Sequence, residues 1–124
     1  MSKNALIMGI ETSCDETAAA IIQDDSSGIP KILSNIVSSQ FDVHKKFGGV
    51  VPDLAARAHV EKIDLIVKEA LMKSKKSLND IDAVAATAGP GLIVCLSVGL
   101  NFAKALSLSL NLSLIHISEP TRLA

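Results

Sequence analysis

The chain has 124 residues, a length that suits one domain with a buried core. Its 12 Lys and Arg residues against 13 Asp and Glu residues give a net charge of -1, so no strong overall field attracts nucleic acid. This balance argues against a dedicated basic DNA-binding module. Aromatic residues make up only 2% of the chain, so the core is predicted to consist of Ala, Val, Ile and Leu, as in α/β proteins with a buried sheet.

Apolar runs and turn residues in the first 39 positions predict three strands. Residues 5–10 form a short apolar run typical of a buried strand, and residues 17–23 are predicted to be its hairpin partner. Asp, Ser, Gly and Pro at 24–30 mark a turn, and β-branched residues at 31–39 indicate a third strand. Because the turns are short, we expect an antiparallel meander.

A helix is predicted from Pro52 to about Lys73. Proline is well tolerated in the first turn of a helix. The apolar residues recur at helical spacing and define one apolar face; they are Ile63, Ile66, Val67, Ala70 and Leu71. Residues 77–80 are then expected to form a cap before a short turn.

The stretch 83–103 carries no charge and approaches the length of a membrane span. Glycine and proline at 89–91 break it near its start, so we expect a buried strand at 82–87, a turn, and a buried helix at about 92–110. The glycine turn between strand and helix is a place where backbone N–H groups can face an anion. A tight connection without a ligand explains the same residues.

The predicted first hairpin is unusually polar. Residues 9–17 read GIETSCDET, and hydroxyl and N–H groups in a tight turn can hold phosphate oxygens. A carboxylate at the end of the first strand can hold a metal or a water. Carboxylates favour a phosphate only when a cation lies between them, so this pattern implies a metal. The alternative is a solvated turn, which the same residue types favour.

Three segments taken together resemble one family. GIETSCDET at 9–17, FGGVVPDLAARAH at 47–59 and DAVAATAGPGL at 82–92 resemble, in order and spacing, the TsaD family of tRNA threonylcarbamoyladenosine synthases. The resemblance implies an α/β fold of the actin/Hsp70/sugar-kinase type, which is ribonuclease H-like and has two lobes around a nucleotide cleft. Residues 1–111 would be the first lobe, a mixed sheet with flanking helices.

The resemblance also implies site residues. Glu11 stands where related ATPases carry an acidic residue near metal and phosphates, which makes it the candidate catalytic residue. The other implied residues fall into a phosphate-binding or nucleotide-binding set (Ser13, Asp15, Glu16, Thr17, Gly89 and Gly91) and a cleft signature (Gly48, Gly49, Val50, Val51 and Pro52).

The implied reaction is transfer of a threonylcarbamoyl group from threonylcarbamoyl-AMP to N6 of adenosine 37 in tRNAs that read codons beginning with A. One divalent metal ion, Fe or Zn or Mg, would assist it in the full-length family. The implied partners are tRNA, a paralogous protein of the same fold and a small ATPase, with no DNA and no membrane. The alternatives are a non-catalytic paralogue that acts as a dimerisation partner in the same pathway and a sugar or acetate kinase. The acidic hairpin argues against both, together with the GGVVP segment in the case of the paralogue and the VVPDLAARAH segment in the case of the kinase.

The final residues depart from the family. Its metal-binding His-x-x-x-His pair would fall near Glu119 and Leu123, and His116 has no histidine four positions later. No metal ligand is therefore assigned in this chain. Residues 112–122, LSLIHISEPTR, resemble the translation of a common sequencing adapter, so we expect 112–124 to be non-native; a genuine divergent terminus is the alternative. Without a second lobe, we expect an inactive chain with exposed apolar surface.

Compartment follows from the cysteines and the N-terminus. Cys14 and Cys95 form neither a disulfide framework nor a metal-binding pair, which fits a reducing cytosol. The apolar run near the N-terminus is too short for a signal peptide. We expect a cytoplasmic protein.

Overall fold

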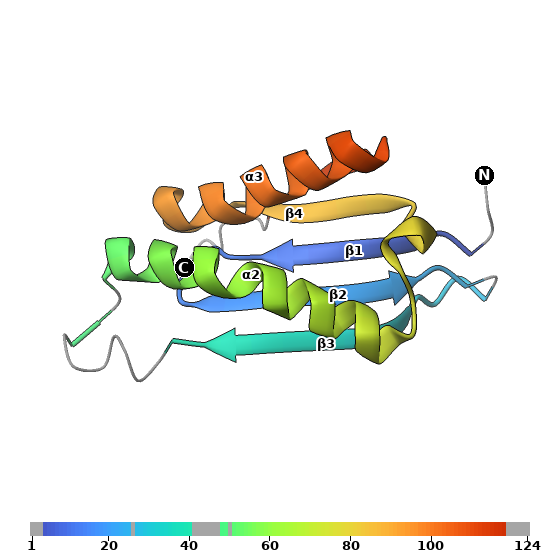
Figure 1. The fold of residues 1–124 in the computed structure, drawn as a ribbon, viewed down its shortest axis with the longest axis horizontal. Coiled ribbons are helices and arrows are strands. Elements are labelled where there is room, and N and C mark those ends of the chain that lie inside the picture. Colours follow the sequence, from blue (N-terminus) through green and yellow to red (C-terminus); the bar gives the residue numbers. More distant parts are fainter. Residues whose placement is uncertain (1–3, 26, 41–47, 50, 119–124) are drawn as a thin grey trace.

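The computed structural model describes residues 4–25, 27–40, 48–49 and 51–118 (Figure 1). A sheet of five strands carries two long helices and one short 3-10 helix. In chain order the elements are β1 (Leu6–Glu11), β2 (Glu16–Gln23), β3 (Lys31–Ser39), α2 (Pro52–Ser74), η1 (Leu78–Asp80), β4 (Ala83–Gly89), α3 (Ile93–Leu110) and β5 (Ser113–Ser118).

The strands lie in the order β3-β2-β1-β4-β5. The first three form the predicted antiparallel meander, with Glu11 opposite Ala18 and Thr17 opposite Ser38. Helix α2 then carries the chain back across β2 and β3, so that β4 joins β1 in parallel (Figure 1). The mixed sheet therefore places the carboxyl ends of β1 and β4 at the same edge.

The hydrophobic core lies between the sheet and the two helices. Side chains alternate along β1, so that Leu6, Met8 and Ile10 are buried while the intervening residues are only half-buried. The same cluster includes Ile21 of β2, Val84 of β4 and the apolar residues of α2. Apart from Met8, the buried residues of this cluster are Ala, Val, Ile and Leu, as the composition predicts.

Helix α2 and the cap that follows it agree with the prediction. Helix α2 begins at Pro52 and ends where Lys75 adopts a left-handed conformation, close to the predicted bounds. The structure buries the predicted apolar stripe of α2, with Leu71 packed at its edge. The Ser34 hydroxyl of β3 donates to the Ala70 carbonyl of α2 over 2.8 Å. The predicted cap at 77–80 is also confirmed, because Ser77 and Asp80 form a capping box.

The expectation of a buried helix at 92–110 is wrong for much of its surface. Leu108 and Ile93 are each 83% exposed, because α3 contacts the sheet and α2 along one face only. By length and composition α3 could cross a membrane, with a mean hydropathy of 1.7 over its 18 residues. Core helices of soluble proteins pass the same test, and α3 lies along β4 beside α2 (Figure 1).

The first part of the segment expected to be non-native, residues 112–124, forms an edge strand of the sheet. Residues Ser113–Ser118 form β5 and pair with β4 in parallel, and Leu114 packs against the core. His116 lies in this strand with its side chain exposed. The positions aligned with the family's two histidines, Glu119 and Leu123, lie outside the described residues.

The sheet face away from the helices is apolar and open, which leads to a first prediction. Ile32 and Val37 of β3 are 69% and 52% exposed, and apolar surface of this kind drives association. We expect the 124-residue chain to bind a hydrophobic dye and to gain mass with concentration in light scattering. Replacing both residues with lysine should reduce both signals, because charge on an edge strand opposes pairing. Ser109→Lys on α3 is the control; an equal reduction by it would contradict the prediction.

Candidate functional site

The turn after β1 and the turn after β4 meet at the shared edge of the sheet. Leu92 donates its backbone N–H to the Ser13 carbonyl over 2.9 Å. A Cβ atom built on Gly91 would lie 2.6 Å from the same carbonyl oxygen, closer than any side chain tolerates. The absence of a side chain at Gly91 thus permits the contact. Two elements that the sequence predicts separately form one site.

Three consecutive carbonyl groups of the β1–β2 turn are held by donors from three different segments. Ser13 accepts from Leu92 at the start of α3. The Cys14 carbonyl lies 2.8 Å from Nε2 of His59 in α2, and the Asp15 carbonyl accepts from the backbone N–H of Gln40 over 3.0 Å. The conformation of the turn is therefore fixed by α2, α3 and the end of β3 together.

These bonds also orient the N–H groups of the turn. In a trans peptide the carbonyl and the following N–H point to opposite sides, and the only cis peptide bond among the described residues joins Gly89 to Pro90. The N–H groups of Cys14, Asp15 and Glu16 therefore point away from the partners that hold the preceding carbonyls. Successive N–H groups presented from a turn are the geometry with which proteins hold anions.

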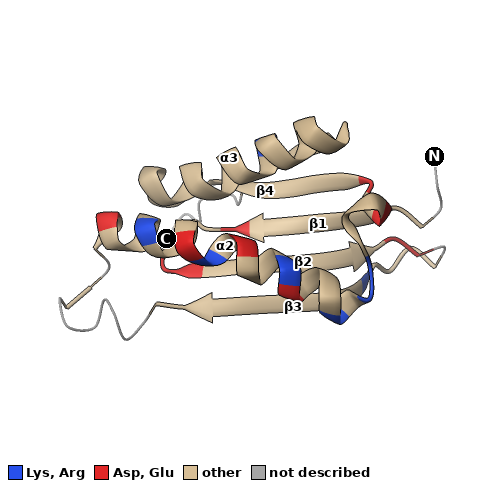
Figure 2. Cartoon of the chain, viewed as in Figure 1, with Lys and Arg blue, Asp and Glu red and all other residues tan. Residues whose placement is uncertain are grey.

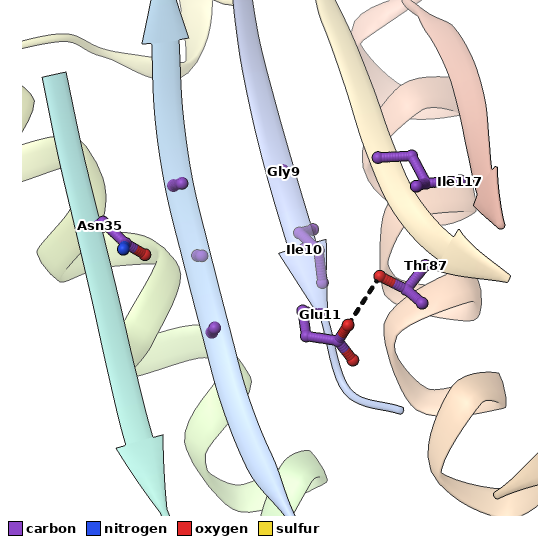
Figure 3. Close-up of a pocket in the computed structure, with 9 residues that line it drawn as sticks. Gly9, Ile10, Glu11, Asn35, Thr87 and Ile117 are labelled. Atoms are coloured by element: carbon purple, nitrogen blue, oxygen red, sulfur yellow. Dashed lines mark hydrogen bonds between the residues drawn. The ribbon is translucent and has the colours of Figure 1, made fainter. Parts of the chain in front are cut away.

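Glu11 lies at the end of β1, where its carboxylate is held from two sides. The backbone N–H of Ser13 donates to Oε1, and the Thr87 hydroxyl of β4 donates to Oε2 over 3.0 Å (Figure 3). Glu11 lines a pocket of ≈ 210 Å³ on the open face of the sheet (Figure 3) and a second pocket of ≈ 140 Å³ over the turn. The two hydrogen bonds therefore fix the orientation of the Glu11 carboxylate, which lines both pockets.

The charge of this edge is negative. Figure 2 shows acidic positions where β1 ends and β2 begins, and the smaller pocket is lined by Glu11, Asp15 and Glu16 together with Ser13 and Cys14. Among the described residues, no three His, Cys, Asp or Glu side chains are grouped so that they could hold a metal ion. The described residues therefore do not supply a three-ligand metal site by themselves.

Thr17, predicted to bind phosphate, lies beneath the turn. Its side chain is fully buried, and its hydroxyl is 2.7 Å from Nδ1 of His59. Because a carbonyl only accepts, Nε2 of His59 carries the proton that the Cys14 carbonyl receives, and in the neutral ring Nδ1 accepts from Thr17. The His59 ring thus makes one hydrogen bond from each of its two nitrogens.

Thr12 ties the end of β1 to the middle of α3. Its buried hydroxyl donates to the Cys95 carbonyl over 2.7 Å and accepts the N–H of Gly99 over 3.0 Å. The Cys95 carbonyl and the Gly99 N–H are the acceptor and donor spaced four residues apart in an α-helix, and the Thr12 hydroxyl bonds to both. A Cβ on Gly99 would lie 2.6 Å from Thr12 Oγ1, which explains glycine inside this helix.

A Cβ atom on the other glycines predicted to line the site would not contact the turn, in contrast to Gly91. A Cβ on Gly89 would approach only Ser118 of β5, at 3.9 Å. Gly48 adopts a positive φ of 73°, and a Cβ on Gly48 or Gly49 would meet nothing within 4 Å. Val51 and Pro52 begin α2, and Val50 lies outside the described residues.

Four residues at this site were not singled out from the sequence. Thr12 bonds to the backbone of α3, Thr87 donates to Glu11, Gln40 holds the Asp15 carbonyl, and Gly99 makes room for Thr12. Thr12 shares the helix-facing side of β1 with Ile10, so a period-two reading extended by one step would have predicted its burial. Thr87 could have been found in a similar way, because it is the hydroxyl residue directly before the glycine turn at 88–91.

The surroundings of both cysteines oppose a role as nucleophile. Burial raises the pKa of the Cys14 thiol, and the negative charge of Asp15 raises it further. Burial likewise raises the pKa of Cys95, which is fully buried against β1. A thiol with a raised pKa holds less thiolate at neutral pH, and the thiolate is the reactive form.

The fold defines a class of protein. YeaZ from Pseudomonas aeruginosa superposes with a TM-score of 0.67 at 15% identity, over 93% of this chain and 43% of that chain. RuvC from Thermus thermophilus in complex with Holliday junction substrate superposes with a TM-score of 0.57 at 13% identity, over 92% and 66%. The chain thus has the ribonuclease H-like architecture of one lobe of the actin/Hsp70/sugar-kinase fold, as the sequence predicts.

Sequence comparison places the chain within that class. The family described as "TsaD: tRNA N6-adenosine threonylcarbamoyltransferase" matches residues 31–124. A protein of that name from Pelagibacter ubique is 64% identical over 96% of this chain, and one from Bacillus subtilis is 50% identical over 93%. The chain belongs to the TsaD family. It spans 33% and 32% of the length of these two relatives.

The Thr12–Gly99 contact predicts a reversal of sign in a double mutant. Gly99→Ala should lower the free energy of unfolding by about 1–3 kcal/mol, because its Cβ overpacks against Thr12. In a Thr12→Ala background the same substitution should be neutral or stabilising, because alanine favours a helix over glycine by about 1 kcal/mol. Urea unfolding of the four chains measures this, and an equal loss in both backgrounds would show that the hydroxyl contact is not the cause.

The raised pKa of Cys14 predicts slow alkylation. In a Cys95→Ser chain, the rate with iodoacetamide should rise with pH at a higher midpoint than for free cysteine, because thiolate forms later. Asp15→Asn should lower that midpoint, since it removes the largest charge acting on the thiol. Rapid alkylation at pH 7 would instead identify Cys14 as an activated nucleophile.

Proposed function

We propose that this chain forms the nucleotide-binding first lobe of a transferase. The full-length protein moves a threonylcarbamoyl group from threonylcarbamoyl-AMP to N6 of adenosine 37 in tRNAs that read codons beginning with A. The enzyme name of the family supports the acyl transfer and the tRNA substrate. Because the chain spans about a third of its relatives, the activity belongs to the longer protein, and this lobe by itself is inactive.

One observation carries the proposal: the turn at residues 13–15 is held rigid by three other segments. The Ser13, Cys14 and Asp15 carbonyls each accept a hydrogen bond from a different segment, which leaves the following N–H groups on the other side of each peptide. A preorganised set of N–H donors stabilises an anion without the cost of rearranging at the moment of binding. The phosphate of the adenylate is the anion that fits this element, and Gly91 lets the second turn close beside it.

Glu11 is the candidate for direct participation. Its carboxylate is fixed by Ser13 and Thr87 and borders the pocket over the turn. A carboxylate in this position orients a water, a cation or the exocyclic amine relative to the bound phosphate. Ser13, Asp15 and Glu16 form the remaining wall of the pocket. Attack of the amine on the carbamoyl carbon releases AMP, and the lobe contributes chiefly position.

The proposal also includes a metal ion, partner proteins and a compartment. A divalent ion, Fe or Zn or Mg, would take its ligands from the remainder of the full-length protein, since the described residues do not supply a group of three. The partners we propose are a paralogous protein of the same fold and a small ATPase, in addition to tRNA. The compartment we propose is the cytoplasm, where two free cysteines are stable.

A chimera tests the function. Residues 1–111 replace the matching segment of the Pelagibacter ubique relative, which restores the remaining two-thirds of a family member. With its partner proteins and threonylcarbamoyl-AMP, the chimera should form threonylcarbamoyladenosine in tRNA, measured by mass spectrometry of digested nucleosides. A folded chimera that leaves tRNA unmodified while the parent enzyme is active would contradict the proposal.

Glu11→Gln in the chimera should lower kcat/KM at least about tenfold, because the charge that orients the reacting groups is lost while the shape is kept. Asp24→Asn is the matched control. It neutralises an exposed carboxylate in the β2–β3 turn at the opposite end of the sheet and should leave kcat/KM unchanged. Equal effects of the two substitutions would assign Glu11 no special role.

A further inference from the structure

His59 occupies an unusual position for a buried ionisable side chain. It projects from α2, is fully buried, and contacts both sides of the β1–β2 turn. Nε2 lies 2.8 Å from the Cys14 carbonyl, and Nδ1 lies 2.7 Å from the Thr17 hydroxyl. One ring therefore spans the turn from Cys14 to Thr17.

The ring controls a peptide group that faces the pocket. Its Nε2–H fixes the direction of the Cys14 carbonyl, and the Asp15 N–H lies on the opposite side of the same planar peptide, where it also reaches the Cys14 thiol. Rotation of that peptide would change the direction of the N–H beside the pocket. Cys14 and Asp15 both line the pocket over the turn, so the ring acts on a wall of the site without touching its contents.

A purely structural role predicts something different. A buried side chain that only fills space stabilises the fold, and any residue of similar volume replaces it at little cost. Here the ring donates from one nitrogen and receives from the other, an arrangement that an apolar residue of equal volume lacks. The Ser34 hydroxyl offers a comparison, because it also joins the sheet to α2 by one buried bond, to the Ala70 carbonyl, near the opposite end of the helix.

We propose that His59 is a positioning residue for the nucleotide: it sets the Cys14–Asp15 peptide so that the turn is complementary to the adenylate phosphate. This rests on the proposed function. Thr17 supports this arrangement, because its hydroxyl lies 2.7 Å from Nδ1 and can donate to it when the proton is on Nε2, facing Cys14. In that tautomer the ring supplies a donor without adding a charge to the acidic turn.

The test uses the 1–111 chimera and its partners. His59→Leu should raise KM for threonylcarbamoyl-AMP about tenfold, because a buried carbonyl loses its donor and the peptide is no longer held. His59→Gln should restore KM to within about threefold of the parent, since its amide N–H can still reach the Cys14 carbonyl. KM for tRNA should be unchanged in both variants. If leucine and glutamine give the same KM for the adenylate, the proposal is overturned.

Two further comparisons separate positioning from folding. Ser34→Ala removes a buried bond between sheet and helix far from the turn; it should lower the melting temperature and leave KM for the adenylate unchanged. If His59→Leu fails to fold, Thr17→Val replaces it as the test: it should raise KM for the adenylate, and Thr17→Ser should restore it. If KM for the adenylate rises in proportion to the fall in melting temperature across all these variants, Ser34→Ala included, the proposal is overturned. An inactive parent chimera would instead overturn the proposed function.

Discussion

The parallel pairing of β1 with β4 is the constraint on which this edge of the molecule depends. Ile10 lies opposite Ala86, so both strands end at the same edge of the sheet, β4 two residues beyond the end of β1, and both turns leave the sheet there. The contact between them is close, with room for a hydrogen at Gly91 and none for a methyl group. If β4 paired in another register, the Leu92 N–H would lose Ser13 and the turn would lose one of its three supports.

The site is a surface turn with the rigidity of a buried element. Loops ordinarily move more than the strands they connect. Here the carbonyls of residues 13–15 are bound to α3, α2 and the end of β3, and Thr12 just before them is bonded into the α3 ladder. Displacing the turn would break several buried hydrogen bonds at once. Because ligand binding to a preordered element avoids an entropy cost, this construction favours affinity for a small anion.

Sequence patterns predicted the individual strands and helices well, and the contacts between them less well. The meander, the helix from Pro52 and the cap at Ser77 follow from local periodicity and turn chemistry, which one segment contains in full. The contact of Gly91 with Ser13 depends on the register between β1 and β4, whose paired residues are 76 positions apart in the sequence, and no local pattern encodes it. Thr17 shows the same limit: its hydroxyl resembled a ligand for phosphate, and alternation along β2 turned it toward His59.

The choice of histidine beneath the turn follows from the charge above it. Glu11, Asp15 and Glu16 make the rim negative, so a phosphate needs a cation brought from outside the described residues. A lysine or arginine below the turn would supply charge, but from the interior it would pair with these carboxylates and would be costly to bury. An imidazole with its proton on Nε2 can hold the Cys14 carbonyl without adding a charge, and it leaves the carboxylates free of an interior ion pair. The negative rim and the fixed turn are then kept apart: the carboxylates face the pocket, and the support of the turn lies beneath it.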